Sequence, residues 1–275
     1  MIAVAVAVVL LAADAGTLLS RPVKVTADSL RVFNKENRAV YEGHATAVRD
    51  SMTLTCDTLI AHYNARQQVT RIEMKGHVRG VDGDRWATGE EATFDNLTGL
   101  LVATGHPEGG DGARHVVGSK VTFSTERDET QVEDARTSSE EKTPQGARRI
   151  DISADHLTLE SRRHLATWVG HVVAHRESVV VRAPKMVAYS DDSGAVSRVE
   201  AMGGVDVTDK DRWARGSRMD YDNRSGVLVV TGKPEARQGT HRMRGTRVTF
   251  HSDRDFLEVE NAVTVVDGSA RKPGP

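Results

Sequence analysis

The second half of this 275-residue sequence repeats the first half at a constant offset of 127 residues. The match shows no gap and relates the stretch from Pro22 to Ala135 to the stretch from Arg149 to Ala262. Three of its clearest elements are Gly43-His44, which returns as Gly170-His171, Asp84-Arg85-Trp86-Ala87, which returns as Asp211-Arg212-Trp213-Ala214, and Val121-Thr122-Phe123, which returns as Val248-Thr249-Phe250. A tandem duplication of this kind predicts two copies of one fold along the chain.

Each half contains a shorter internal repeat. Small residues that open a polar-then-apolar pattern recur at spacings of 29, 33 and 29 residues: Ala27, Cys56, Gly89 and Gly118. A series of glycines falls between them at spacings of 33 and 29: Gly43, Gly76 and Gly105. Regular periods in this range are typical of stacked supersecondary units that bury a shared core.

The repeating units are predicted to be β-strands. Apolar and polar residues alternate in Val23-Lys24-Val25-Thr26-Ala27 and in Ile150-Asp151-Ile152-Ser153-Ala154, and no stretch keeps a helical period. Turn-forming residues such as Asn34-Lys35-Glu36-Asn37 interrupt the pattern, so we expect an all-β chain of about sixteen short antiparallel strands. The alternation changes phase at Ala27-Asp28, where a bend or bulge would let both neighbouring runs face one interior.

The duplication predicts a first domain over residues 22–136 and a second domain over residues 149–266. The polar residues 137–148 between them predict a linker, and residues 267–275 predict a disordered tail. At the start, a short apolar run precedes Ala13-Asp14-Ala15, so residues 1–15 are predicted to be a signal peptide that is cleaved on export. The alternatives are a misassigned start codon and a short uncleaved anchor.

Composition and motifs exclude several classes of function. The 37 basic and 39 acidic residues are mixed along the chain, so no basic face for nucleic acid is expected. Cys56 is the only cysteine, which rules out an intrachain disulfide, and its alternating context predicts a small buried side chain. No nucleophile motif, phosphate-binding loop or metal-ligand spacing occurs, so we expect no catalytic residue, no metal and no other cofactor.

Four motifs follow one another in the first half: Val25-Thr26-Ala27-Asp28-Ser29-Leu30, Ala39-Val40-Tyr41-Glu42-Gly43-His44-Ala45, Leu54-Thr55-Cys56-Asp57-Thr58-Leu59 and Val69-Thr70-Arg71-Ile72-Glu73-Met74-Lys75-Gly76-His77-Val78. In their order and composition they resemble the OstA-like family, which includes the lipopolysaccharide (LPS) transport proteins LptA and LptC and the N-terminal domain of LptD. The resemblance covers nearly all of the chain after the predicted signal peptide, in two tandem copies. The chain departs from the family in having two domains where LptA has one, and Gly-His where the family has Gly-Asn.

The resemblance implies a tandem β-jellyroll, in which two antiparallel sheets fold like a taco around lipid A acyl chains. It also implies a non-enzymatic periplasmic carrier that moves LPS from the inner to the outer membrane. Its partners would be inner-membrane LptC-like and outer-membrane LptD-like proteins, joined by pairing of edge strands. Two alternatives stay open: a structural adaptor that links envelope proteins by strand addition without binding lipid, and a polysaccharide-active enzyme on a β-solenoid.

Positions that are apolar in both copies are the candidate lipid-binding residues, because acyl chains require apolar side chains that face the interior. In the first half they are Val25, Leu30, Val32, Leu54, Leu59, Ile72, Val78, Phe94, Leu101, Val121 and Phe123. In the second half they are Ile152, Leu157, Leu159, Val181, Met186, Val199, Val205, Tyr221, Leu228, Val248 and Phe250. The competing interpretation is that these side chains only pack against one another.

Two sets of polar residues recur with the repeat. Four histidines follow turn glycines: His44, His77, His106 and His171. Stacked in register they would form a column that could bind a metal or respond to pH, whereas the simpler interpretation makes them polar residues beside a turn. Three aspartates share one repeat position: Asp28, Asp57 and Asp155. Their recurrence favours turn capping over a unique catalytic pair.

The ends of the chain predict how the domains are joined. The first strand, from Val23 to Ala27, has one charge and no bulge-forming glycine, so it is poorly protected against pairing with another strand. We expect the two domains to stack, with a strand near Val121 to Phe123 pairing with Ile150 to Ala154. The two outer edges are then predicted to recruit partners by strand addition.

Overall fold

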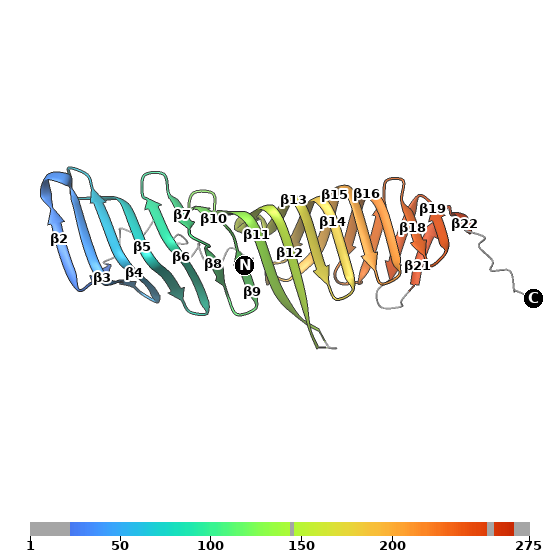
Figure 1. Ribbon diagram of the computed structural model, residues 1–275, viewed down its shortest axis with the longest axis horizontal. Helices are drawn as coiled ribbons and strands as arrows, with labels where there is room; N and C mark the ends of the chain where they lie inside the picture. Colours follow the sequence, from blue (N-terminus) through green and yellow to red (C-terminus); the bar gives the residue numbers. More distant parts are fainter. Residues whose placement is uncertain (1–22, 144–145, 252–255, 267–275) are drawn as a thin grey trace, which may run out of the picture.

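The computed structural model describes residues 23–143, 146–251 and 256–266. These residues contain 22 strands and two short 3-10 turns, which confirms the all-β class but exceeds the sixteen strands expected. The molecule is elongated, its strands cross the long axis, and the two halves follow one another along that axis (Figure 1). The predicted signal peptide and C-terminal tail lie outside the described residues.

The two halves correspond element by element. The first half contains β1 (Lys24–Thr26), β2 (Ser29–Phe33), η1 (Asn34–Glu36), β3 (Arg38–Arg49), β4 (Met52–Tyr63), β5 (Val69–Asp82), β6 (Arg85–Asp95), β7 (Leu100–Thr104), β8 (Glu108–Gly110), β9 (Arg114–Val117), β10 (Lys120–Ser124) and β11 (Glu129–Thr143). The second half contains β12 (Gly146–Glu160), η2 (Ser161–Arg163), β13 (Leu165–Arg176), β14 (Val179–Ser190), β15 (Val196–Asp209), β16 (Arg212–Asp222), β17 (Val227–Thr231), β18 (Glu235–Gln238), β19 (His241–Arg244), β20 (Arg247–His251), β21 (Phe256–Glu260) and β22 (Val263–Val266). Strands β3 to β7 recur as β13 to β17 at the 127-residue offset, which places Trp86 and Trp213 in equivalent strands.

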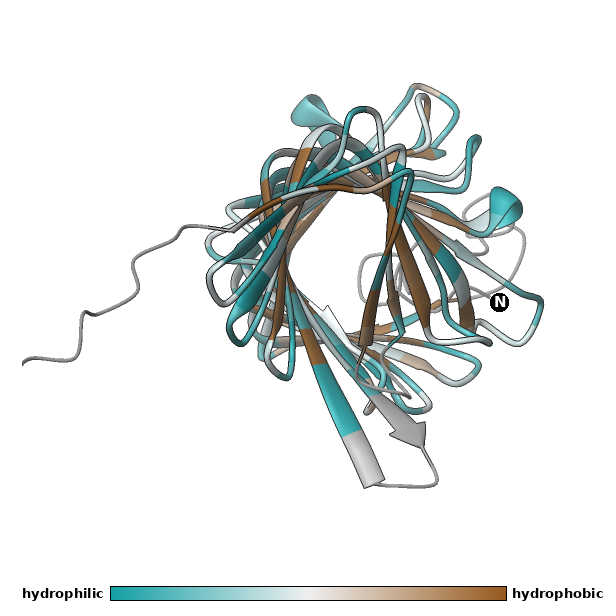
Figure 2. Cartoon of the chain, turned by 90° about the vertical axis from the view of Figure 1, so that its right-hand side faces the viewer, coloured by the Kyte–Doolittle hydropathy of each residue, from teal (hydrophilic) through white to brown (hydrophobic). Residues whose placement is uncertain are grey.

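The strands form two walls, and each long strand contributes one part to each wall. The long strands change register near their middle, as between Glu42 and Ala45 in β3. The parts on either side of this shift have different neighbours, because β2 pairs with residues 38–42 of β3 and β1 pairs with residues 46–48. Such strands therefore pass around a corner from one wall to the other, and Figure 2 shows both walls wrapped around a common axis.

The corners have the backbone geometry of β-bulges. At the corner of β3, Gly43 and His44 both have positive φ, 77° and 47°. Glycine adopts such angles at little cost, and a bulge turns the following side chain to the other face of the strand. In β12, Ile152 and Ala154 are partly or fully buried before the corner, and Leu157 is buried after it. The predicted phase change at the Ala-Asp step is therefore confirmed.

One continuous apolar core, with residues from both halves, lies between the walls. Its most deeply buried large side chains include Phe123 and Leu101 in the first half and Leu157 and Leu159 in the second. Cys56 is 3% exposed and belongs to the same core, as predicted. Burial of apolar surface contributes roughly 25 cal/mol per Å², so this shared core stabilises the stacked units together.

The junction between the halves differs from the predicted linker. Residues 137–143 belong to β11 and residues 146–148 to β12, and these strands pair from Glu129 opposite Glu160 to Thr143 opposite Gly146. The hairpin extends beyond its neighbours in Figure 1. Its polar composition suits paired strands, since the exposed Glu140 lies opposite the exposed Arg149 and cross-strand pairs of opposite charge are favourable.

The prediction that the domains stack is confirmed, but the predicted pairing across the junction is wrong. Strand β10, which contains Val121 and Phe123, pairs with β7 and β11 and not with residues 150–154. Strand β11 lies between them and pairs with β10 on one edge and β12 on the other. The halves therefore meet through a hydrogen-bonded ladder.

Candidate functional site

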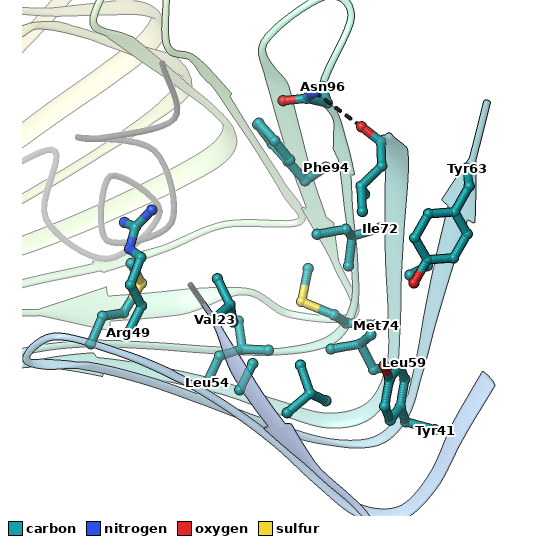
Figure 3. Close-up of a pocket in the computed structure, with 15 residues that line it drawn as sticks. Val23, Tyr41, Arg49, Leu54, Leu59, Tyr63, Ile72, Met74, Phe94 and Asn96 are labelled. Atoms are coloured by element: carbon teal, nitrogen blue, oxygen red, sulfur yellow. Dashed lines mark hydrogen bonds between the residues drawn. The ribbon is translucent and has the colours of Figure 1, made fainter. Parts of the chain in front are cut away.

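A cavity of about 280 Å³ lies between the walls of the first half (Figure 3). Residues in or next to β1, β3, β4, β5 and β6 line it: Val23, Val25, Tyr41, Ala47, Arg49, Met52, Leu54, Leu59, Ala61, Tyr63, Val69, Ile72, Met74, Phe94 and Asn96. Tyr41 precedes the corner of β3 and Ala47 follows it, so both walls contribute to the lining. The bulges that fold the strands thereby create the cavity.

The lining is mainly apolar, with few polar groups. Burial raises the pKa of Tyr63, and the neighbouring Tyr41 adds to this shift, so the Tyr63 phenol stays neutral. Asn96 Nδ2 donates to the carbonyl of Val69 at 3.1 Å. Ligand cavities commonly measure about 300–1,000 Å³, so this cavity is at the small end of that range. It suits one thin apolar segment, such as part of an acyl chain.

The structure divides the candidate lipid-binding residues into groups. Five of them line the cavity: Val25, Leu54, Leu59, Ile72 and Phe94. Twelve are buried in the core: Val78, Leu101, Val121, Phe123, Leu157, Leu159, Val181, Met186, Val205, Leu228, Val248 and Phe250. Three are partly buried against that core: Ile152, Val199 and Tyr221. For most positions, the interpretation as packing residues therefore fits the geometry.

The last two candidates, Leu30 and Val32, are not in the interior. They are 53% and 60% exposed on β2, whereas the equivalent Leu157 and Leu159 on β12 are 1% and 0% exposed. The difference arises because β11 pairs with β12, placing Val132 opposite Leu157, while β2 pairs with β3 alone among the described strands. A repeat position that is buried inside the stack is therefore exposed where no neighbouring strand covers the edge.

Several cavity residues were not predicted from the sequence. Tyr41 has an aromatic counterpart, Trp168, at the 127-residue offset, and Arg49 has the basic counterpart Arg176. The search for positions that are aliphatic or aromatic in both copies could have included Tyr41. Arg49 was outside that search because a charged residue at the end of a strand normally faces solvent.

The recurring aspartates and histidines form pairs at the corners. The Nδ1 atoms of His44, His77 and His171 lie 2.9, 2.8 and 2.8 Å from Asp28, Asp57 and Asp155, respectively. The hydrogen bond to Asp28 and its charge raise the pKa of His44, and Asp57 adds to the shift. Among the described residues, no group of three or more His, Cys, Asp or Glu side chains is placed to hold a metal ion.

Both ends of the molecule present strand edges. In the described part of the chain, β1 and β2 pair only with β3. At the other end, β21 pairs with β20 and β22 with β19. Unpaired edges expose backbone donors and acceptors to any strand that can reach them. The region that the structure describes contains no helix with the length and apolar character required to span a membrane.

The comparison with protein families agrees with the resemblance in the motifs. The structure of LptH, the LptA homologous periplasmic component of the conserved lipopolysaccharide transport device from Pseudomonas aeruginosa, is similar at 18% identity and a TM-score of 0.37. That match covers 42% of this chain and 83% of LptH. No curated protein matches the chain. The model of the family described as LptA/(LptD N-terminal domain) LPS transport protein matches residues 24–129 and again residues 151–256. The two matches span most of the sequence, and the chain therefore belongs to this family of LPS transport proteins.

Proposed function

We propose that this protein is a non-enzymatic periplasmic carrier that binds the acyl chains of LPS and moves LPS from the inner toward the outer membrane. The observation that supports this proposal most directly is the apolar cavity between the walls of the first half. A mainly apolar lining with two tyrosines, one asparagine and one arginine is suited to an amphiphile and offers no set of groups for bond cleavage. Membership of the LPS transport family supports the same ligand.

Binding in this cavity is driven by removal of apolar surface from water. Each buried methylene contributes about 0.8 kcal/mol, so several methylenes supply a useful affinity without any specific polar contact. Such binding has no preferred direction along the molecule. Net movement toward the outer membrane therefore requires energy or a gradient of affinity from other components.

The exposed strand edges support docking of an inner-membrane LptC-like protein and an outer-membrane LptD-like protein. The internal junction provides a physical precedent, because β11 covers β12 by pairing along its whole described length. The repeat equivalents of these two strands are β21 with β22 at one end and β1 with β2 at the other. Strand addition at either end would extend both walls and keep the apolar interior continuous between partners.

Site-specific photocrosslinking tests lipid binding in the native envelope. A photoreactive amino acid at Ile72, which lines the cavity, is expected to crosslink to LPS. The matched control is Lys75, which lies on the same strand with an exposed side chain and is expected to crosslink weakly or not at all. Crosslinked LPS is detected as a shift in mobility that antibodies against both LPS and the protein recognise.

The same experiment separates the carrier from the adaptor that links envelope proteins without binding lipid. An adaptor gives no LPS crosslink at Ile72, although its partners still copurify. Equal crosslinking at Ile72 and Lys75 would also contradict the proposal, because it would indicate contact at the outer surface. The Val25→Pro variant tests docking, since it removes a backbone donor from β1 and is expected to weaken capture of the partner at that end.

A further inference from the structure

A buried guanidinium group beside the cavity has one nitrogen that lacks a hydrogen-bond partner among the described residues. Arg49 is the last residue of β3, lines the cavity and is 8% exposed. Its Nη1 atom is buried and has no hydrogen-bond partner among the residues that the structure describes. Figure 3 shows Arg49 at one end of the cavity, with Tyr41 and Tyr63 at the opposite end. Burial of a cation is strongly unfavourable unless an anion or a set of acceptors compensates it.

The second half shows how the equivalent arginine is satisfied. Arg176 Nη1 donates to the Tyr221 hydroxyl, and the guanidinium lies 5.3 Å from the centroid of the Tyr221 ring. The hydroxyl in turn donates to Asn223 Oδ1 at 3.3 Å. In the first half, the position of Tyr221 is occupied by Phe94, which has no hydroxyl. The duplication has therefore kept the arginine in both halves, but among the described residues only the second half supplies its Nη1 atom with an acceptor.

We propose that Arg49 binds a phosphate group of the lipid that occupies the cavity. This inference rests on the proposed function and names the polar part of the ligand. A guanidinium stays charged, sheds water more readily than an ammonium and presents parallel donors that match two oxygens of a phosphate. The apolar lining next to Arg49 requires the anion to be joined to acyl chains. These two requirements together describe a phosphorylated lipid with acyl chains, and lipid A is the lipid of this kind that the proposed function supplies.

Binding of three ligands to the full-length protein tests this assignment. The ligands are lipid A with both phosphates, the same acylated sugar after removal of the phosphates, and a long-chain fatty acid. The wild type is expected to bind phosphorylated lipid A about 10- to 100-fold more tightly than the dephosphorylated form, which is the range expected for a charge-assisted hydrogen bond. Arg49→Met is expected to remove this preference and to leave affinity for the dephosphorylated lipid within about twofold.

Two further variants exploit the difference between the halves. Phe94→Tyr places a hydroxyl at the position from which Tyr221 accepts a hydrogen bond from Arg176, and is expected to reduce the phosphate preference by about 3- to 10-fold. Tyr221→Phe makes the opposite change in the second half, and is expected to leave binding in the first-half cavity unchanged. Thermal unfolding of each variant confirms that it is folded before binding is measured.

The possible results distinguish this inference from the proposed function. A wild type that binds neither form of lipid A overturns the proposed function together with the role of Arg49. Equal wild-type affinity for both forms, or equal loss of both in Arg49→Met, overturns only the phosphate contact. A fatty acid that loses as much affinity in Arg49→Met as phosphorylated lipid A overturns the assignment to phosphate.

Discussion

Leu30 and Leu157 occupy the same position of the repeat, but among the described strands only Leu157 has a neighbouring strand on each side. Replacing each leucine with alanine therefore separates the effect of side-chain type from the effect of edge coverage. Leu157 is 1% exposed, and truncation of a fully buried leucine costs about 2–5 kcal/mol of unfolding free energy. Leu30 is 53% exposed, so its truncation removes about half of a burial term of roughly 1.5–3 kcal/mol, or about 1 kcal/mol.

Thermal unfolding followed by circular dichroism measures this difference. For a chain of this size, 1 kcal/mol shifts the Tm by about 2–4 °C, so Leu157→Ala is expected to lower the Tm by roughly 4–20 °C and Leu30→Ala by about 4 °C or less. Equal shifts would refute the conclusion that the β2 edge is uncovered in the isolated protein.

The affinity of a partner protein for the β2 edge provides a second test. Docking of a strand on β2 would bury the rest of Leu30 and Val32, which together contribute about 2 kcal/mol, or roughly 30-fold in Kd. The Leu30→Ala, Val32→Ala double variant is expected to lose that affinity for an LptC-like or LptD-like partner. Leu97→Ala is the control, because Leu97 is 80% exposed in a turn between β6 and β7. Equal loss of affinity in the control would show that docking does not depend on this edge.

Three other predictions concern the corners and the core. Gly170→Ala is expected to lower the free energy of unfolding by about 2–3 kcal/mol, because a β-carbon there would lie 2.1 Å from Asp155 Oδ2. Gly112 also has positive φ but no atom within 4 Å of an added β-carbon, so Gly112→Ala is expected to lower it by about 1 kcal/mol. Equal losses in chemical denaturation would exclude the contact with Asp155. The pKa of His44 is raised, so its contribution to stability is complete below the ordinary histidine value of about 6.5 and is lost as pH rises through the folded value. NMR titration is expected to show this raised pKa and its fall toward 6.5 in Asp28→Asn, and an unchanged titration would contradict the pairing. Burial raises the pKa of Cys56 to about 11, so alkylation at pH 8 is expected to be slow in the folded protein and fast in denaturant; equally fast reaction in both states would show that the thiol is accessible.

Features that depend on local patterns were predictable from the sequence. The alternation in Ile150-Asp151-Ile152 indicates a strand, and the change of phase at Ala27-Asp28 indicates the corner. Both signals arise from a side-chain period of two, which is readable within a few residues. The duplication adds a second, independent sample of each pattern, so the correspondence of the two halves was also predictable.

Features that depend on distant strands were not predictable in the same way. Residues 137–148 have the composition of a linker, and only the pairing of β11 with β12 makes them strands. Leu30 and Leu157 have equivalent local sequences, and only the presence of β11 decides which side chain is buried. The contact of Arg176 with Tyr221 likewise depends on a distant strand, and the equivalent residue in the first half, Phe94, lacks the hydroxyl group.

The corners that join the two walls have a mechanical consequence. Because long strands such as β4 and β5 cross the corner without a break in the chain, the walls cannot slide past each other as separate plates. A ligand that widens the interior must instead increase the angle between the two walls at the strands that it contacts. The interstrand hydrogen bonds transmit part of that change to the levels before and after it. The widening then decreases gradually along the long axis. A ligand bound between one set of strands therefore lowers the elastic cost of widening the interior between the neighbouring strands.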